Sequence, residues 1–302
     1  MTAVVALGGN ALVREGQRGT TAEQRASLRE QCEALRPLLD GPVAITHGNG
    51  PQVGATLLRS ERAADEVPPL PLWLAVGQTQ AEIGALIELE LVPVAKRQVT
   101  VVVTHVRVDP ADPAFEDPTK PIGPFYPRER AKTLERERGW RVVEDAGRGW
   151  RRAVASPEPR EIVELDAIRE LLESDAIVVA CGGGGIPVEE RDGRLDGVDA
   201  VIDKDLASAL LARELEAARL VVLTDVDALY RDFRGPAEEA VPSLTVAEAE
   251  ELRAELPHGS MGPKLEACAA FVRATGGEAL ITSADALARA LAGKSGTRIV
   301  RE

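Results

Sequence analysis

Short apolar segments that end in glycine-rich loops limit the possible folds of this chain more than any other sequence feature. The segments 3–7, 42–46 and 177–181 are rich in Val, Ile and Ala, as buried parallel strands are. The loops after them contain, in order, Gly8, Gly9 and Asn10; Gly48, Asn49 and Gly50; and the four-glycine run 182–185. Each segment is therefore predicted to be a strand followed by a loop. Because glycine has no side chain, the backbone of such a loop can approach a ligand closely.

Helical patterns alternate with these strands along the chain. Apolar residues recur at helical spacing in 21–39, 72–91, 162–172, 204–215, 260–275 and 284–291. Further strands are predicted at 99–108, 220–224, 278–281 and 297–300. Strands that alternate with helices predict an α/β fold with a mainly parallel sheet covered on both faces.

One segment breaks this alternation. Residues 109–160 contain eight prolines and are too irregular for a core sheet and too long for an ordinary connection. Residues 107–160 also carry twelve Lys and Arg against ten Asp and Glu, whereas the whole chain has a net charge of −13. We therefore predict an inserted subdomain or lid at 109–160, between two parts of the α/β fold at 1–108 and 161–302.

Composition excludes several classes of function. A net charge of −13 argues against broad affinity for nucleic acid or anionic membranes, which extended positive fields hold. The three cysteines are widely spaced within apolar patterns, as buried reduced thiols are, and the three histidines have no metal-ligand spacing. No basic leader precedes the first strand, and no apolar stretch reaches membrane-spanning length, so we expect a cytoplasmic enzyme without a resident metal.

The glycine loops predict a phosphate site. Parallel sheets bind ligands at the carboxyl ends of their strands, so the three loops are expected to meet in one crevice. Backbone N–H groups freed of side chains can bind anions there. One such loop alone would be an ordinary tight turn, but three in register favour a site.

Two lysines support the same prediction, since each falls in the first turn of a predicted helix. Lys204 lies between Asp203 and Asp205 at the start of the helix at 204–215, and Lys264 lies near the start of the helix at 260–275, where Ser260 is the expected N-cap. A cation there costs about 0.3–1 kcal/mol against the helix dipole, and a bound phosphate would compensate it. The alternative is that each lysine simply pairs with a neighbouring acid.

Thr224, Asp225 and Tyr230 follow another predicted strand. They suit a nucleotide contact, in which Thr and Asp bond ribose or base and Tyr230 flanks the ring. They suit a turn or helix cap equally well. The residues alone do not decide between the two.

Eight motifs in order resemble the carbamate kinases of the amino acid kinase family. They are VALGGNAL at 5–12, THGNGPQVG at 46–54, KPIGPFY at 120–126, DAGRGWRR at 145–152, CGGGGIPV at 181–188, AVIDKDLAS at 200–208, LTDVDALY at 223–230 and GSMGPK at 259–264. The resemblance implies a three-layer α/β/α sandwich with a protruding lid, usually a homodimer. It also implies reversible phosphoryl transfer between carbamoyl phosphate and ADP, with Mg²⁺ carried by the nucleotide, and a role in arginine metabolism.

By the same resemblance, Lys204 holds the transferring phosphoryl group, Asp205 orients Lys204, Lys264 contacts the nucleotide phosphates, and Lys120 reaches over carbamoyl phosphate from the lid. The substrate pocket is implied to contain Gly8, Gly9, Asn10, Gly48, Asn49, Gly50, Gly183 and Gly184. The nucleotide side is implied to contain Thr224, Asp225, Tyr230, Gly262 and Lys264. His47 is interpreted as a residue of loop geometry.

The sequence departs from the family pattern in places. Ala6 stands where many amino acid kinases have lysine, as it does in carbamate kinases, and Ala155 and Glu158 alter the exit of the lid. Two alternatives are a kinase for another small acid and a non-catalytic ligand sensor. The first predicts a divergent 120–126 motif and the second predicts loss of Lys204, Asp205 or Lys264, and neither change is present.

Overall fold

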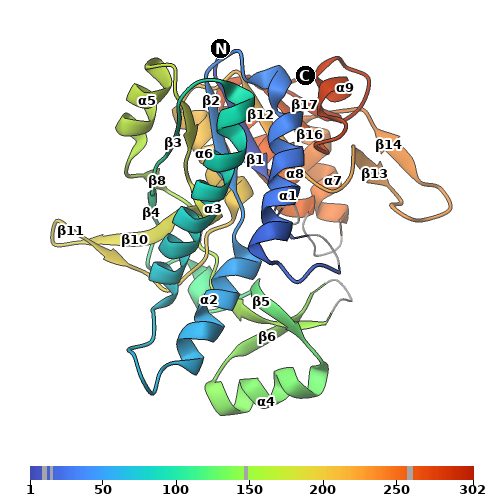
Figure 1. Cartoon of the computed structure of the whole chain (residues 1–302). Coiled ribbons are helices and arrows are strands. Elements are labelled where there is room, and N and C mark those ends of the chain that lie inside the picture. The colour runs from blue at the N-terminus through green and yellow to red at the C-terminus, as the bar shows by residue number, and fades with distance from the viewer. Residues whose placement is uncertain (9–11, 14–15, 146–148, 257–260) are drawn as a thin grey trace.

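The computed structural model describes residues 1–8, 12–13, 16–145, 149–256 and 261–302 (Figure 1). An eight-stranded sheet lies at its centre, in the order β15–β17–β16–β12–β1–β2–β9–β3. Its neighbouring strands pair in parallel except β16 and β17. In that order the strands are Ser243–Thr245, Thr297–Val300, Glu278–Thr282, Arg219–Leu223, Ala3–Leu7, Val43–His47, Ile177–Val179 and Val99–Val101. The predicted α/β class with a mainly parallel sheet is confirmed.

Helices cover both faces of this sheet. Successive strand residues point to opposite sides, and the central strands carry apolar residues on both sides that the helices bury. In β1, Val4 and Ala6 belong to one hydrophobic core, and Val5 and Leu7 belong to another. The first core includes side chains of α5 (Leu165–Glu173), α6 (Lys204–Glu214), α7 (Val246–Glu255) and α8 (Met261–Thr275). The second includes side chains of α1 (Thr21–Ala34), α3 (Leu72–Ala95) and α9 (Leu287–Leu291). The result is a three-layer α/β/α sandwich.

The β-branched run at 99–108 is not one strand, as the sequence predicts, but two. Its second part, β4 (His105–Arg107), leaves the central sheet for a four-stranded one with the order β11–β10–β4–β8. The break falls at Thr104, whose hydroxyl accepts a hydrogen bond from the Cys181 amide (3.0 Å) and donates to the Val102 carbonyl (2.8 Å). The other strands of this sheet, unpredicted, are β8 (Glu161–Ile162), β10 (Ile186–Arg191) and β11 (Arg194–Gly197).

The predicted insertion at 109–160 contains more regular structure than its prolines suggest. A three-stranded sheet, β5–β7–β6, and helix α4 form what we call the outer unit. Its elements are β5 (Lys120–Tyr126), α4 (Arg128–Arg138), β6 (Arg141–Glu144) and β7 (Trp150–Val154). Both prolines of β5 lie on an edge strand: Pro121 pairs in register with Ala153, and Pro124 falls where the register against β7 shifts. The exact boundaries of a lid subdomain stay a prediction.

The outer unit lies at one end of the molecule, beyond helix α2 (Gly50–Arg62), as Figure 1 shows. It packs on α2 through Ile122 and Val154, which share a hydrophobic core with Val53 of the helix. At the same interface Gly54 and Gly123 touch so closely that a Cβ added to Gly54 would lie 1.8 Å from the Gly123 Cα. This backbone contact sets the distance between β5 and α2.

Other predicted elements hold with shifted ends. The helix predicted at 21–39 ends at Ala34, where Pro37 enforces a short 3-10 turn, and the helix predicted at 72–91 continues to Ala95. Helices α2 and α7 and the hairpin of β13 (Leu229–Arg231) and β14 (Glu239–Val241) are not predicted. In the described part of the chain, no helix is both long and apolar enough to cross a membrane.

Candidate active site

Four loops meet at the carboxyl edge of the central sheet, because β12, β1, β2 and β9 are neighbours. Gly8 follows β1, and the loop with Gly48 follows β2. A Cβ added to Gly8 would lie 2.9 Å from the carbonyl oxygen of Leu223, the last residue of β12. The predicted convergence of glycine loops is therefore present for the described residues; Gly9 and Asn10 lie outside them.

The four-glycine run is needed for close packing as much as for ligand access. Added Cβ atoms would lie 2.3 Å from the His47 ring at Gly182 and 2.1 Å from the Asn49 amide at Gly183. The N–H groups of Gly184 and Gly185 donate within the loop itself, each at 3.0 Å. The expectation of bare N–H groups is therefore wrong for these two glycines.

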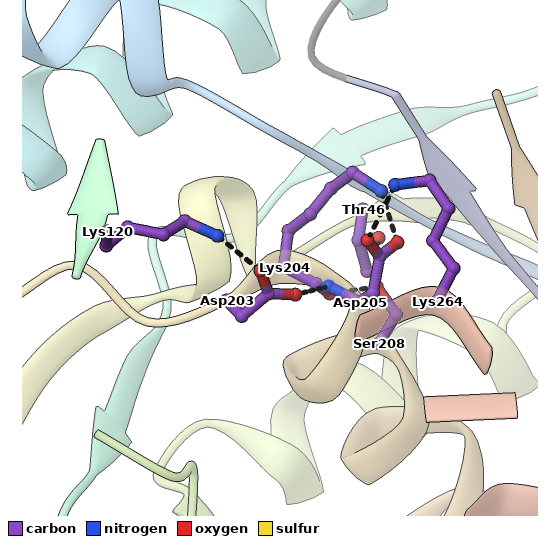
Figure 2. A network of polar contacts seen from close by, with 7 residues as sticks. All are labelled: Thr46, Lys120, Asp203, Lys204, Asp205, Ser208 and Lys264. Carbon is purple, nitrogen blue, oxygen red and sulfur yellow. Dashed lines mark hydrogen bonds and ion pairs between the residues drawn. The ribbon is translucent and has the colours of Figure 1, made fainter. Parts of the chain in front are cut away.

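Three lysines from distant parts of the chain meet two aspartates at this edge (Figure 2). Lys204 and Lys264 both contact the Asp205 carboxylate, and the Lys264 Nζ lies 3.1 Å from its Oδ2. Lys120, the first residue of β5, contacts the Asp203 carboxylate. The predicted catalytic residues are thus brought together, and Lys204, Asp205 and Lys264 are each less than a tenth exposed.

The start of α6 explains how two of these side chains are placed. Asp203 is its N-cap, and one carboxylate oxygen accepts a hydrogen bond from the Asp205 amide at 2.8 Å. Lys204 and Asp205 then follow in the first helical turn. Lys264 lies in the first turn of α8, as predicted, although the expected N-cap Ser260 lies outside the described residues.

Burial and charge shift the pKa values of this cluster. Burial lowers the pKa of Lys204, and the positive charge of Lys264 lowers it as well. Together they outweigh the Asp205 carboxylate, which raises this pKa. Burial opposes protonation of Lys264 too, but Asp205 and Asp203 raise its pKa overall. Burial alone would raise the pKa of Asp203. The positive charges of Lys120 and, to a smaller extent, Lys204 lower it by more, so the net shift of this pKa is downward. Asp225 also raises the pKa of Lys264. Three lysines gathered at one edge of the sheet suit an anionic ligand.

The hydroxyls of Ser208 and Thr46, which sequence reasoning missed, form a hydrogen-bonded pair that holds the backbone of Lys204 (Figure 2). The Ser208 hydroxyl donates to the Lys204 carbonyl at 2.5 Å, and its oxygen lies 2.6 Å from the Thr46 hydroxyl. Thr46 is the penultimate residue of β2, so it lies one residue before the loop with Gly48 and Asn49. Since Ser208 uses its proton on Lys204, Thr46 is the donor to Ser208. Both residues are fully buried.

Buried amides hold the loops after β2, β3 and β9. The Asn49 side chain donates to the Thr79 hydroxyl at 3.0 Å, and Gln80 donates to the carbonyls of Thr104 and Gly182, each at 3.2 Å. His47 is 1% exposed, and burial lowers its pKa to about 4. A neutral, enclosed imidazole agrees with the interpretation of His47 as a residue of loop geometry.

The residues predicted for the nucleotide side are spread around the end of β12. Thr224 and Asp225 follow the strand, and the Tyr230 hydroxyl donates to the Asp227 carboxylate at 2.6 Å. Asp227 was not predicted, although it lies within the same motif. Gly262 lies in the first turn of α8, and a Cβ added to it would meet no atom of the described residues within 4 Å.

Comparison with known proteins gives the class of protein first. The model of the amino acid kinase family matches residues 1–283. The chain therefore belongs to the amino acid kinase family.

Its relatives within that family define the group more narrowly. The carbamate kinase of Thermococcus kodakarensis is 45% identical over 99% of both chains, and that of Trichomonas vaginalis is 46% identical over 99% of both. The structure of Giardia lamblia carbamate kinase bound to citric acid superposes with a TM-score of 0.95 and 38% identity, covering 100% of this chain and 98% of that one. The resemblance to carbamate kinases is confirmed.

Proposed function

We propose that the protein transfers a phosphoryl group reversibly between carbamoyl phosphate and ADP, giving ATP and carbamate, which breaks down to ammonia and carbon dioxide. The observation that carries this proposal is the meeting of Lys120, Lys204 and Lys264 at the carboxyl edge of the sheet. The full-length relatives named carbamate kinase support the choice of substrate.

The cluster suits the chemistry of in-line phosphoryl transfer. That reaction needs two anions brought together and the charge of the moving group compensated. Lys204 would hold the transferring phosphoryl group, with Asp205 fixing its ammonium, and Lys264 would contact the nucleotide phosphates. Carbamate is itself an oxygen nucleophile, so the mechanism requires no general base.

The two substrates would approach from opposite sides of this cluster. Carbamoyl phosphate would lie against the loops after β1, β2 and β9, with Lys120 above it, so that the outer unit acts as a lid. The nucleotide would lie beyond the end of β12. The residues proposed for the nucleotide are Thr224, Asp225, Tyr230, Gly262 and Lys264.

We propose that Mg²⁺ enters with the nucleotide as part of the substrate. The described residues contain no group of three or more His, Cys, Asp or Glu side chains that could hold a metal ion. The Asp205 carboxylate already contacts two lysines. Phosphate oxygens and water would therefore supply most ligands of the ion.

We also propose a homodimer formed through α3. This helix exposes an apolar stripe at helical spacing that includes Ala81, Ala85, Leu89 and Val92. Leu89 is 58% exposed and Val92 is 44% exposed, which is unusual for large apolar side chains on one helix face. Light scattering of the wild type and Leu89→Glu tests this proposal.

The absence of nucleic-acid and membrane partners and residence in the cytoplasm stay predictions from the sequence.

The test of the proposed activity is ATP formation from carbamoyl phosphate and MgADP by the purified protein. Lys204→Ala should lower kcat by about 10³-fold or more, on the scale of removing a preorganised charge from a transition state. Lys294→Ala, which removes an exposed lysine, is the matched control. Wild-type protein that binds MgADP and makes no ATP would contradict the proposal and direct attention to other small acids.

A further inference from the structure

Asp203 joins two parts of the molecule that carry different catalytic groups (Figure 2). One carboxylate oxygen accepts the Asp205 amide at 2.8 Å, which caps the helix that presents Lys204. The other oxygen contacts the Lys120 ammonium, 83 residues away in sequence. Sequence reasoning treats Asp203 only as a neighbour of Lys204.

We propose that Asp203 is a positioning residue for Lys120: it holds the lysine of the outer unit beside Lys204, so that the remaining Lys120 N–H groups point at the phosphoryl group. This inference rests on the proposed function. It adds to that function a residue that acts through Lys120 rather than on the substrate.

The geometry of the outer unit explains why such an anchor is needed. Arg138 and Arg152 both pair with Glu61 and so fix the unit to α2. The contact of Lys120 with Asp203 instead ties β5 to the start of α6, where the chemistry is proposed. Without it, the long flexible side chain of Lys120 would have to find its position anew in each catalytic cycle.

The chemistry of the two groups fits this division. A lysine ammonium has three donors, so one bond to Asp203 leaves two for phosphoryl oxygens. The Asp203 side chain is 12% exposed and that of Lys120 is 29% exposed, so the pair is well shielded from water. Removing one charge from such a shielded pair leaves the other without compensation.

Capping α6 is the alternative role of Asp203, and the variant Asp203→Asn separates the two. Asparagine caps helices about as well as aspartate, so the amide oxygen keeps the bond from Asp205. The charge that holds Lys120 is lost. Asp203→Ser, which also keeps a capping oxygen, is the second variant if the first fails to fold.

The first experiment is a double-mutant cycle with Asp203→Asn, Lys120→Met and the combined variant. We expect Asp203→Asn to lower kcat/KM for carbamoyl phosphate about 10-fold or more and to change KM for ADP less than twofold. In the Lys120→Met background the same change should have less than a twofold effect. Wild-type kinetics for Asp203→Asn, or effects of the two changes that multiply in full, would overturn the inference.

The second experiment does not depend on activity. The outer unit shares its core with α2, so loosening it exposes Ile122 and Val154 and should speed amide hydrogen exchange in β5 and β7. In the ligand-free protein, Asp203→Asn, Lys120→Met and the double variant should exchange equally fast there, several-fold faster than the wild type. Peptides from α1 serve as the internal control.

Unchanged exchange in all three variants would refute the anchor, whatever the enzyme catalyses. Absence of ATP formation by the wild type would instead refute the proposed function and leave the exchange result to decide whether Asp203 holds Lys120. The two failures are therefore distinguishable.

Discussion

Replacing Gly54 by alanine tests how strictly the outer unit must be seated on α2. The added Cβ would lie 1.8 Å from the Gly123 Cα and 2.2 Å from its nitrogen, both backbone atoms that no side-chain rotation can move away. Ordinary contact begins at 3.4 Å, so β5 and α2 have to separate by about 1.6 Å. Lys120 is three residues from Gly123 and moves with it.

Two effects of Gly54→Ala oppose each other, which makes the result informative. Within a helix, alanine is favoured over glycine by about 1 kcal/mol, so α2 alone becomes more stable. Overpacking of the interface costs about 1–3 kcal/mol. A misplacement of about 1 Å can lower the rate about 10²-fold, so we expect that loss in kcat/KM for carbamoyl phosphate with little change in ADP affinity.

Steady-state assays of ATP formation, urea unfolding and ADP titration measure these three quantities. Gly41→Ala is the matched control, because the nearest atom to its added Cβ is 3.7 Å away. A Gly54→Ala enzyme with wild-type kinetics and a higher free energy of unfolding would refute the reasoning. It would mean that the contact of α2 with Gly123 yields without moving Lys120.

Three further predictions concern buried groups. Thr46→Val should lower kcat about 10-fold, because it leaves the Ser208 hydroxyl without its donor. Thr46→Ser keeps a hydroxyl and should retain the wild-type kcat. Equal loss of activity in both variants would contradict a role for the Thr46 hydroxyl. His47 has its pKa lowered by burial to about 4, so the unfolded state binds more protons between pH 4 and 6.5 and stability rises with pH there, by up to about 3 kcal/mol. Urea unfolding should show this slope reduced in His47→Gln. Burial raises the pKa of the Cys32 thiol to about 12, and all three cysteines are buried, so Ellman's reagent should label them only in denaturant.

Local patterns were enough to predict the architecture and the neighbourhood of the site. The apolar run at 3–7 became a strand at those bounds, since burial on both faces requires continuous apolar sequence, and the strand predicted at 297–300 also has those bounds. Lys204 and Lys264 fell in first helical turns because capping and apolar spacing are local properties. The order of strands and loops then placed both lysines at the carboxyl edge.

Some unpredicted elements did carry local signals. Asp192 and Gly193, both with positive φ, form the turn between β10 and β11, as Asp-Gly pairs often do. Thr245 and Glu248 form a capping box at the start of α7. These elements could have been predicted from the sequence, whereas the partners within the site could not.

Periodicity, capping and turn preferences act over a few residues, so local patterns specify the α/β fold, the glycine loops and the first-turn positions of Lys204 and Lys264. Three contacts arise only in the folded molecule: Lys120 with Asp203, Thr46 with Ser208 across 162 residues, and the close approach of Gly182 to the His47 ring. Such contacts depend on how whole elements pack against one another. No local pattern specifies the partner of a polar side chain that lies on a distant element, and the site is built from such partners.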